Sequence, residues 1–499
     1  MFMHVNKYQE KDNMKKYHAV IFAGLVSRAY NRYRGARGHA AYRLRSAAAE
    51  RGYNTRVLDF AWSLSVDRAM QVLEKFVTLD TKLIGISATF WQPWHWGQLP
   101  AVISEEFFDR VRTRWPHVKL VLGGPGSGMV QTQHLFDYHV KGYSDRIWPD
   151  LLAHVHGKPT FGLKFERLVE DGTQIVSCPP GSAGDSMDRL NTRFLPEDYI
   201  ESWEPLPIEI SRGCIFKCAF CSFQLNGKTK NDYVRPADLL LDELRYNQEH
   251  FGTTSYMFLD DTYNDSLYKL EEVGNAVKRL DFDISFSTFL RPELMVKWPE
   301  QIDMMIESGL EGGTVGLESL EPTSRSRVKK SSWVEPVLEA CSRINKTSGI
   351  HASLIAGLPG DTRATLERDM AYMDTQDVFK SWIWVPLNIH NVENSDAASD
   401  MDKNPESYGY SVLPGGQRNN IVNWAINDID FDYVSRIALA NNRATAEKKL
   451  VAGWDVSGAR ALGFTKDEID TMTWGYLDSH ALERARAIAG KYYSKIISE

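Results

Sequence analysis

Short apolar runs alternate with amphipathic segments along the first third of the chain. The runs YHAVIFAGLV, NTRVLDF, KLIGISATF and VKLVLGG suit buried strands, and the segments RLRSAAAERGY, RAMQVLEKFV and FFDRVRTRW between them have helical periodicity. This strand–helix–strand order predicts an α/β fold with a doubly wound, Rossmann-like domain and a parallel sheet. We place this domain at residues 1–157.

The alternation stops at residues 158–205, where Pro, Gly, Ser and Asp are frequent, as in CPPGSAGDSMDRLNTRFLPEDY. Such a composition is typical of a connector. Residues 206–390 then contain six strand candidates, PIEIS, SYMFL, DISFST, GTVGL, HASLIAG and SWIWVPLNI, separated by helical segments. Six βα units predict a partial barrel. We expect residues 391–499 to form a mostly helical region that shapes a substrate pocket.

Composition narrows the class of protein. Of the 499 residues, 43% are hydrophobic, 25% charged and 11% aromatic, which matches a globular protein and excludes a disordered or collagenous chain. The longest apolar stretches, such as Ala19–Val26, are far shorter than the roughly 20 residues that span a bilayer. The N-terminal segment also lacks the apolar core of a secretory signal. We therefore expect a cytoplasmic protein without a membrane partner.

The net charge of −7, from 58 basic and 65 acidic residues, argues against indiscriminate binding to nucleic acid. The stretch Arg28–Arg45 is a local exception, because it interleaves six arginines with three tyrosines and contains no acid. This pattern suits phosphate or nucleic-acid contact, and a solvated helix face with cation–π packing is an equal alternative. Nucleic acid therefore stays open as a partner. A second basic group, at Arg325–Lys330, is expected to be a surface feature.

Three of the five cysteines, Cys214, Cys218 and Cys221, lie in the segment IEISRGCIFKCAFCSF at spacings of four and three. Structural zinc sites have four ligands, and no His or further Cys occurs between Cys221 and His250, so zinc is the weaker alternative. Three thiolates on one loop fit a [4Fe–4S] cluster with one iron open to a reactant. The two other cysteines are too few for a second all-cysteine cluster and are expected to be small packing residues.

This segment resembles the radical S-adenosylmethionine (SAM) superfamily, whose C-x3-C-x-aromatic-C signature is matched by Cys214, Cys218, Phe220 and Cys221. In that family the signature loop follows the first strand of a partial (β/α)6 barrel, and here it follows PIEIS. The resemblance implies an enzyme that reductively cleaves SAM at a [4Fe–4S] cluster to make a 5′-deoxyadenosyl radical. It also implies a one-electron reductant such as flavodoxin or ferredoxin as a partner.

The same resemblance implies that SAM contacts the carboxyl ends of the later strands, where active-site residues of such barrels gather. Phe220 of the signature is expected to lie beside SAM. The other implied SAM residues are Asp260 and Asp261 for the ammonium group, Ser287 and Arg291 for further polar groups, Glu318 and Ser319 for the ribose, and Gly357 near the adenine.

Each of these residues has a plainer alternative role. The acids Asp260, Asp261 and Glu318 each follow a predicted strand, where a carboxylate often caps the next helix. Arg291 precedes a proline and could pair with a surface acid. The functional hypothesis is favoured because all of these residues occur in register with the cysteines.

A doubly wound domain followed by such a barrel resembles the cobalamin-binding group of radical SAM enzymes. The Asp-x-His-x-x-Gly motif that supplies a cobalt ligand is absent, and His39 lacks its partners, so the resemblance implies cobalamin bound without a protein His. The alternatives are a domain that binds nothing and a plain strand-to-loop turn at the glycines. The implied cobalamin residues are Ser87, Thr89, Gly123 and Gly124 at the nucleotide tail, and Trp91 and Gln92 at the lower face of the corrin.

These observations favour a cobalamin-dependent methyltransferase that acts on an unactivated carbon of a small-molecule or peptide substrate. One alternative is a radical SAM enzyme that catalyses a rearrangement, cyclisation or oxidation without methyl transfer. Another is a non-catalytic iron–sulfur or zinc module. The identity of the substrate stays open, although His390, Tyr408 and Tyr410 are expected near the mouth of the barrel.

Overall fold

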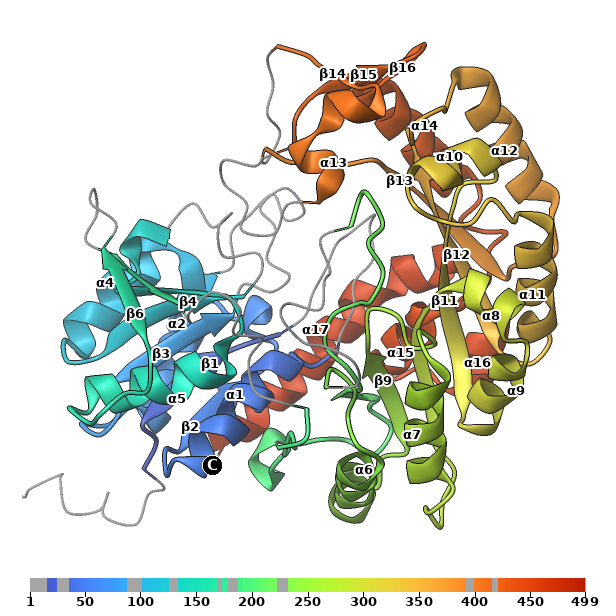
Figure 1. The fold of residues 1–499 in the computed structure, drawn as a ribbon. Coiled ribbons are helices and arrows are strands. Elements are labelled where there is room, and N and C mark those ends of the chain that lie inside the picture. The colour runs from blue at the N-terminus through green and yellow to red at the C-terminus, as the bar shows by residue number, and fades with distance from the viewer. Residues whose placement is uncertain are drawn as a thin grey trace, which may run out of the picture.

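Two parallel sheets, one in each half of the chain, dominate the computed structural model (Figure 1). The first lies in the blue-to-teal part of the ribbon and the second in the green-to-orange part. The described residues are 16–24, 36–87, 101–124, 133–167, 173–177, 187–189, 191–221, 232–391, 399–414 and 421–498.

The first sheet confirms the doubly wound N-terminal domain. Its parallel strands have the order β2-β1-β3-β4-β5, so the strand order reverses between β1 and β3. In open α/β sheets, ligands bind beyond the carboxyl ends of the strands at such a reversal. The strands are β1 (Ala19–Phe22), β2 (Thr55–Leu58), β3 (Leu83–Ser87), β4 (Lys119–Gly123) and β5 (Tyr138–Lys141).

Helices cover both faces of this sheet, because successive side chains of a strand point to opposite faces. Ala19 and Ile21 of β1 belong to the same buried cluster as residues of α1 and α5, whereas Val20 and Phe22 cluster with residues of α2 and α4. The four helices are α1 (His39–Glu50), α2 (Val66–Phe76), α4 (Glu105–Arg114) and α5 (Ser144–Val155).

The first sheet continues into the segment that we expected to be a connector. Strand β7 (Gln174–Ser177) pairs parallel to β5, and β6 (Lys164–Arg167) pairs antiparallel to β7. The predicted boundary at residue 157 is therefore wrong. Since both strands have only four residues, their sequence pattern is too short to distinguish them from loop.

The second sheet confirms the partial barrel, because all six predicted strands pair in parallel in sequence order and the two end strands do not pair with each other. Its strands are β8 (Leu206–Glu209), β9 (Ser255–Leu259), β10 (Ser285–Leu290), β11 (Leu310–Glu318), β12 (Gly349–Ala356) and β13 (Ser381–Pro386). The helices after these strands are α6 (Ala237–Phe251), α7 (Leu267–Val277), α8 (Pro292–Lys297), α9 (Glu300–Glu307), α10 (Pro322–Arg327), α11 (Glu335–Asn345) and α12 (Arg363–Thr375).

The C-terminal region divides into three parts rather than forming one helical unit. A cap contains a small antiparallel sheet, and its helix α14 packs on β13. A short helix, α15, packs against β9, β10 and β11. The elements are α13 (Asp400–Lys403), β14 (Ser411–Val412), β15 (Trp424–Ile426), β16 (Ile429–Asp430), α14 (Phe431–Ala444), α15 (Trp454–Arg460) and α16 (Lys466–Thr471).

The third part is the long helix α17 (Trp474–Ser498), which runs back to the N-terminal domain (Figure 1). Tyr492 and Tyr493 are buried in the same hydrophobic cluster as α2 and α4. The hydroxyl of Tyr493 donates a hydrogen bond to the carbonyl oxygen of Asp59 at 2.5 Å. The last helix of the chain therefore completes the core of the first domain.

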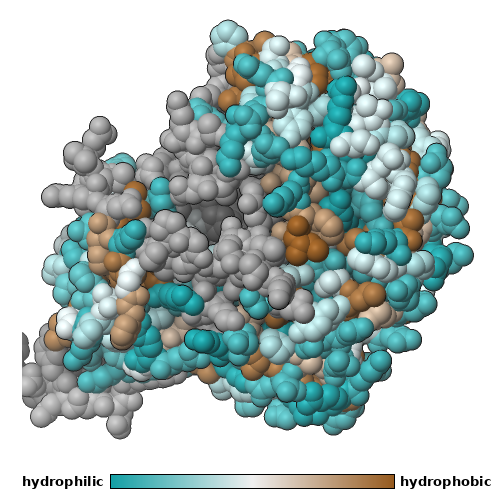
Figure 2. Space-filling model, viewed as in Figure 1, coloured by the Kyte–Doolittle hydropathy of each residue, from teal (hydrophilic) through white to brown (hydrophobic). Residues whose placement is uncertain are grey.

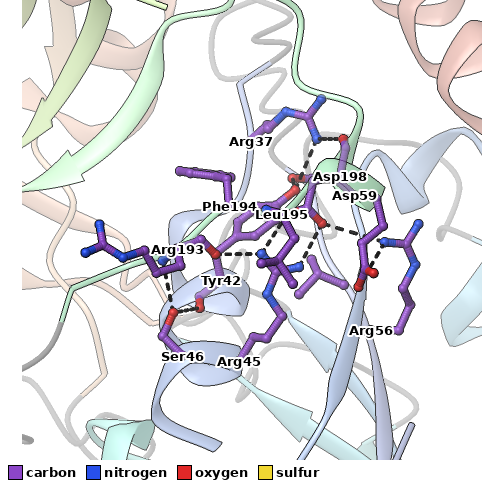
Figure 3. A network of polar contacts seen from close by, with 12 residues as sticks. Arg37, Tyr42, Arg45, Ser46, Arg56, Asp59, Arg193, Phe194, Leu195 and Asp198 are labelled. Atoms are coloured by element: carbon purple, nitrogen blue, oxygen red, sulfur yellow. Dashed lines mark hydrogen bonds and ion pairs between the residues drawn. The ribbon is translucent and has the colours of Figure 1, made fainter. Parts of the chain in front are cut away.

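Buried ion pairs join the N-terminal domain to the segment before the barrel (Figure 3). Arg37, Arg43 and Arg45 are at most 4% exposed. Arg45 Nη2 lies 2.6 Å from Asp198 Oδ2, and Arg37 Nε lies 2.6 Å from Glu204 Oε2. The expectation of nucleic-acid contact is wrong for these three arginines, because acids distant in sequence neutralise them. The other arginines of that stretch lie outside the described residues.

The basic group after β11 is half internal, because Arg325 and Lys330 are buried whereas Arg327 and Lys329 are exposed. Arg325 is fully buried and pairs with Glu293, and Lys330 is 9% exposed. Our expectation of a surface feature is wrong for these two residues. It is confirmed for Lys329, which is exposed and pairs with Asp400 at 2.8 Å.

The face of the barrel drawn in Figure 2 is mostly polar. In Figure 2, teal and white side chains predominate over the helices around the barrel, and brown side chains occur in small groups. Among the described residues, none of the helices combines the length and the apolar character that crossing a bilayer requires.

Candidate active site

The cysteine loop follows β8 at the carboxyl end of the barrel and is fixed by its own backbone. Ala219, which lies between Cys218 and Cys221, is buried. Its N–H donates to the carbonyl oxygen of Val328 at 3.2 Å, and its carbonyl oxygen accepts from the N–H of Met401 at 2.9 Å. The loop is thereby tied to the end of α10 and to α13.

A cavity of about 370 Å³ lies against this loop, and all three cysteines line it. Strands β10 to β13, the loop after β9, and α15 supply the rest of its wall. Within the described part of the chain, no three His, Cys, Asp or Glu side chains are arranged to hold a single metal ion. The cysteine sulfurs therefore share a cavity without converging on one point.

Polar groups contact the sulfurs of Cys218 and Cys214. Arg291 Nη1 donates to Cys218 Sγ at 3.3 Å, and Thr262 Oγ1 lies 3.3 Å from Cys214 Sγ. Arg291 also lies over the ring of Phe216, with 4.0 Å between Cζ and the ring centroid. Burial raises the pKa of Cys214, which in the absence of a bound cation favours the thiol. The donors suit sulfurs that carry negative charge.

Of the residues that we predicted for SAM, Phe220, Asp261, Arg291 and Glu318 line the cavity together with the cysteines. Asp261 is open to the cavity, yet the surrounding protein desolvates it and raises its pKa to about 6, with a smaller contribution from the charge of Asp260. Its carboxylate is therefore partly protonated in mildly acidic solution.

Asp260 and Ser287 do not line the cavity. Asp260 is buried and pairs with Lys269, whose Nζ lies 2.9 Å from its Oδ2. Ser287 is fully buried, and its hydroxyl lies 2.5 Å from the hydroxyl of Ser457 in α15. Both side chains are engaged by internal partners, so the structure separates them from the residues that line the cavity.

Ser319 and Gly357 lie outside the cavity as well. The hydroxyl of Ser319 accepts a hydrogen bond from the N–H of Glu321 at 3.0 Å. Gly357 has a φ of +99° and is covered by Trp424, whose ring would lie 2.4 Å from a Cβ at this position. The cap, rather than a ligand, occupies the space beside this glycine. His390, Tyr408 and Tyr410 are not among the lining residues either.

The cavity contains residues that the sequence analysis missed. Those on the strands carry a signal. Thr314 and Gly316 alternate along β11, and His351 and Ser353 alternate along β12, so each pair points to one side of the sheet. Trp454 and Asp455 carry no local signal, since α15 enters the barrel from a distant part of the chain. The missed lining residues are Thr262, Phe289, Leu290, Thr314, Gly316, Lys330, His351, Ser353, Ile383, Trp454 and Asp455.

In the first domain, three of the residues predicted for cobalamin gather at the carboxyl edge of the sheet. Ser87 and Gly123 are partners in the β3–β4 register. Gly124 has a φ of +100°, a conformation that glycine adopts without strain. The remaining predicted residues, Thr89, Trp91 and Gln92, lie outside the described residues.

His39 contacts a residue of a distant segment. Its Nε2 lies 3.0 Å from the hydroxyl of Thr192, in the segment before the barrel. Desolvation by burial lowers the pKa of His39, so the imidazole is neutral near pH 7. The structure thus gives this histidine a packing partner.

The sequence profile of the radical SAM superfamily matches residues 208–373, which include the cysteine loop and the strands β9 to β12. The chain contains a radical SAM domain. Such a domain implies a [4Fe–4S] cluster and SAM, as the signature predicted. The protein is therefore a radical SAM enzyme.

One relative is similar in amino-acid sequence over most of this chain. An uncharacterized methyltransferase of Pyrococcus horikoshii is 23% identical over 344 residues, which cover 65% of this chain and 71% of the relative. This similarity extends beyond the radical SAM domain.

Two solved structures share the whole architecture. The radical SAM methyltransferase TsrM from Kitasatospora setae has a TM-score of 0.63 at 14% identity and covers 95% of this chain and 100% of its own. The cobalamin-dependent SAM radical enzyme OxsB, with aqua-cobalamin and SAM bound, has a TM-score of 0.60 at 12% identity and covers 95% of this chain and 72% of its own. At these identities the likeness shows the fold, including the arrangement of an N-terminal Rossmann-like sheet beside a radical SAM barrel.

Proposed function

We propose that this protein is a cobalamin-dependent radical SAM enzyme that methylates an unactivated carbon of its substrate. One observation carries the proposal: Cys214, Cys218 and Cys221 line a single cavity together with Arg291 and Glu318. The cysteine sulfurs are thus available to bind a cluster. The guanidinium of Arg291 and the carboxylate of Glu318 are available at the same site to bind a zwitterionic cofactor.

The residues present fit a [4Fe–4S] cluster bound by the three cysteines. Thiolates are the usual ligands of such clusters, and hydrogen bonds to the sulfurs help to set the reduction potential. Arg291 donates such a bond to Cys218 in this structure, and the hydroxyl oxygen of Thr262 lies beside Cys214. When bound, the cluster supplies a low-potential electron for reductive cleavage of SAM. A reductant such as flavodoxin or ferredoxin is the partner that this chemistry needs.

The charged residues of the cavity suit the polar ends of SAM. Arg291 offers a guanidinium to a carboxylate, although its own side chain already contacts Glu293 at 3.3 Å. Asp261 offers a carboxylate to the ammonium group, and Glu318 offers one to the ribose hydroxyls. Apolar side chains such as Leu290 and Ile383 complete the wall and keep water from the reacting atoms.

The carboxyl edge of the first sheet suits cobalamin. Ser87 can donate a hydrogen bond there, and Gly123 and Gly124 leave space for an approaching ligand because they lack side chains. The same arrangement of domains occurs in OxsB, whose structure contains aqua-cobalamin. Since His39 is bonded to Thr192, we expect no protein imidazole on the cobalt. When bound, cobalamin supplies a carrier for the methyl group.

The proposal is tested by anaerobic reconstitution of the full chain with iron, sulfide and hydroxocobalamin. We expect about one equivalent of cobalamin after desalting, together with 5′-deoxyadenosine formation from SAM under reducing conditions. The His39→Ala variant should give the same cobalamin spectrum. SAM cleavage without retained cobalamin would favour a radical reaction that does not transfer a methyl group. An intact cluster without SAM cleavage would indicate a non-catalytic module.

A further inference from the structure

The wall of the cavity contains two stacked aromatic rings. The rings of Phe289 on β10 and Trp454 on α15 have centroids 4.8 Å apart and planes inclined by 26°. Both residues line the cavity, and Phe289 is 37% exposed although it lies on a central strand of the barrel. A stacked pair that served only to fill the core would be sealed from solvent. This pair instead presents aromatic surface to the cavity.

Other contacts hold this pair in place. The N–H of Trp454 donates to Thr314 Oγ1 at 2.8 Å, which fixes the start of α15 against β11. The preceding residue, Gly453, has a φ of +63°, and a Cβ there would lie 2.5 Å from His351 Cβ. The backbone at this position therefore requires glycine, and it brings Trp454 close to the strands. These features indicate a built site rather than a chance contact.

The pair borders the residues proposed for SAM. Phe289 precedes Arg291 by two residues, and Thr314, which binds Trp454, precedes Glu318 by four residues on β11. The cavity thus has a charged end at the cysteine loop and an aromatic end at α15. A ligand at the aromatic end would be adjacent to SAM rather than in its place.

The geometry of the rings selects the kind of ligand. An aliphatic cation is best held by several aromatic faces that surround it, whereas two nearly parallel rings offer one continuous stack. A further flat ring can extend such a stack or pack against its edge, with the geometry that aromatic pairs prefer. The neighbouring Leu290 and Ile383 add an apolar wall that suits the rest of such a ring system.

We propose that the aromatic end of the cavity binds the substrate of this enzyme and that the substrate carries a flat, unsaturated ring. This inference rests on the proposed function, because it names the substrate class of that site. It makes Trp454 a residue that determines specificity, contributed by the C-terminal region rather than by the radical SAM domain.

The test compares two ligands of the same skeleton, 2-naphthol and its saturated counterpart decahydro-2-naphthol, by calorimetric titration of the reconstituted full chain in the presence of SAM. Burial of apolar surface alone favours the saturated compound, so tighter binding of 2-naphthol reports the aromatic contact. We expect 2-naphthol to bind about threefold to tenfold more tightly, the range that an aromatic pair contributes.

The variants distinguish an aromatic contact with the ligand from general apolar packing around it. Trp454→Leu should remove the preference for 2-naphthol, Trp454→Phe should retain it, and Phe289→Leu should reduce it. Trp333→Leu alters an indole that is 48% exposed elsewhere on the surface and serves as the matched control. If Trp454→Leu does not fold, the Phe289→Leu and Trp454→Phe variants still decide the question.

Several results would overturn the inference. Equal binding of the two compounds by the unaltered protein would do so, as would a preference that persists in Trp454→Leu. Displacement of 2-naphthol by tetramethylammonium would assign the rings to a cation. Binding of 2-naphthol that occurs without SAM and is lost when SAM is present would assign them to the adenine of SAM. Loss of SAM cleavage in a protein that keeps the ring preference would count against the proposed function alone.

Discussion

Lys330 Nζ lies 3.0 Å from Glu318 Oε1 at the rim of the cavity, and both side chains are buried. Glu318 has a φ of +65°, which is uncommon for a residue other than glycine. Its backbone follows a register shift in β11, after Gly316. A Cβ on Gly316 would lie 2.4 Å from Glu318 Oε1, so this glycine leaves room for the carboxylate. The ion pair thus fixes a carboxylate on a strained backbone.

Lys330→Met should weaken SAM binding by roughly tenfold, because Glu318 loses the cation that orients it. Lys330→Arg should restore most of the affinity. Calorimetric titration with SAM measures the effect. Iron content is the control, because Lys330 contacts Glu318, Glu293 and the carbonyl oxygen of Gly316 in this structure. Unchanged SAM affinity in the methionine variant would contradict a positioning role for this lysine.

Cys218→Ala should abolish both the cluster absorbance and the formation of 5′-deoxyadenosine, because each of the three thiolates would hold one iron. Cys341→Ala is the matched control, since Cys341 is fully buried among residues of the barrel core, away from the cavity. We expect the control to retain its iron. A Cys218→Ala protein that still cleaves SAM would disprove the assignment of the cluster.

Asp361 should make the protein less stable as the pH rises from about 4 to about 7. Burial raises the pKa of Asp361 to about 7, although Gly357, Leu358 and Ser324 donate hydrogen bonds to it. Between its ordinary pKa and 7 the folded state binds more protons than the unfolded state, so the free energy of unfolding falls with pH. Above pH 7 this effect is complete.

Thermal denaturation of Asp361→Asn and the unaltered protein at pH 5 and pH 7.5 measures this effect. Raising the pH from 5 to 7.5 should lower the Tm of the unaltered protein by a few degrees more than it lowers the Tm of the variant. The comparison between proteins removes the contributions of other titrating groups. An identical pH dependence in both proteins would contradict the prediction.

Gly453→Ala should destabilise the protein by about 2 kcal/mol or more, since it adds a Cβ at a positive φ and within 2.5 Å of His351 Cβ and Thr314 Oγ1. Gly490→Ala is the matched control. Gly490 lies inside α17, and a Cβ there would meet nothing within 4 Å, so alanine should be neutral or stabilise by up to about 1 kcal/mol. Denaturant unfolding measures both. Equal stability of the two variants would contradict the inference that the backbone before α15 packs too closely on the strands to accept a side chain.

Arg45→Met should cost about 3–5 kcal/mol, because it leaves the buried carboxylate of Asp198 with a missing partner. Arg279→Met removes an exposed ion pair to Asp238 and should cost less than about 1 kcal/mol. Chemical denaturation of both variants provides the comparison. A small effect of Arg45→Met would show that the charge network of Figure 3 contributes little to the joint between the domains.

The sequence by itself determined the cysteine loop, the second sheet, and the first sheet without its strands β6 and β7. The strands were predictable because buried parallel strands are continuous apolar runs, as in YHAVIFAGLV, and this signal is local. The spacing of Cys214, Cys218 and Cys221 is likewise a property of one short segment. Glu318 differs, because it reaches the cavity beyond the register shift in β11.

Only the tertiary structure decided what lies beside those elements. Asp260 and Asp261 are neighbours in the chain, yet one pairs with Lys269 and the other lines the cavity, because the next helix supplies the lysine to one side only. Arg45 is buried because Asp198 reaches it from another segment. Trp454 enters the barrel because α15 packs across strands that precede it by more than 100 residues. Such contacts join distant parts of the chain, and no local pattern of residues encodes them.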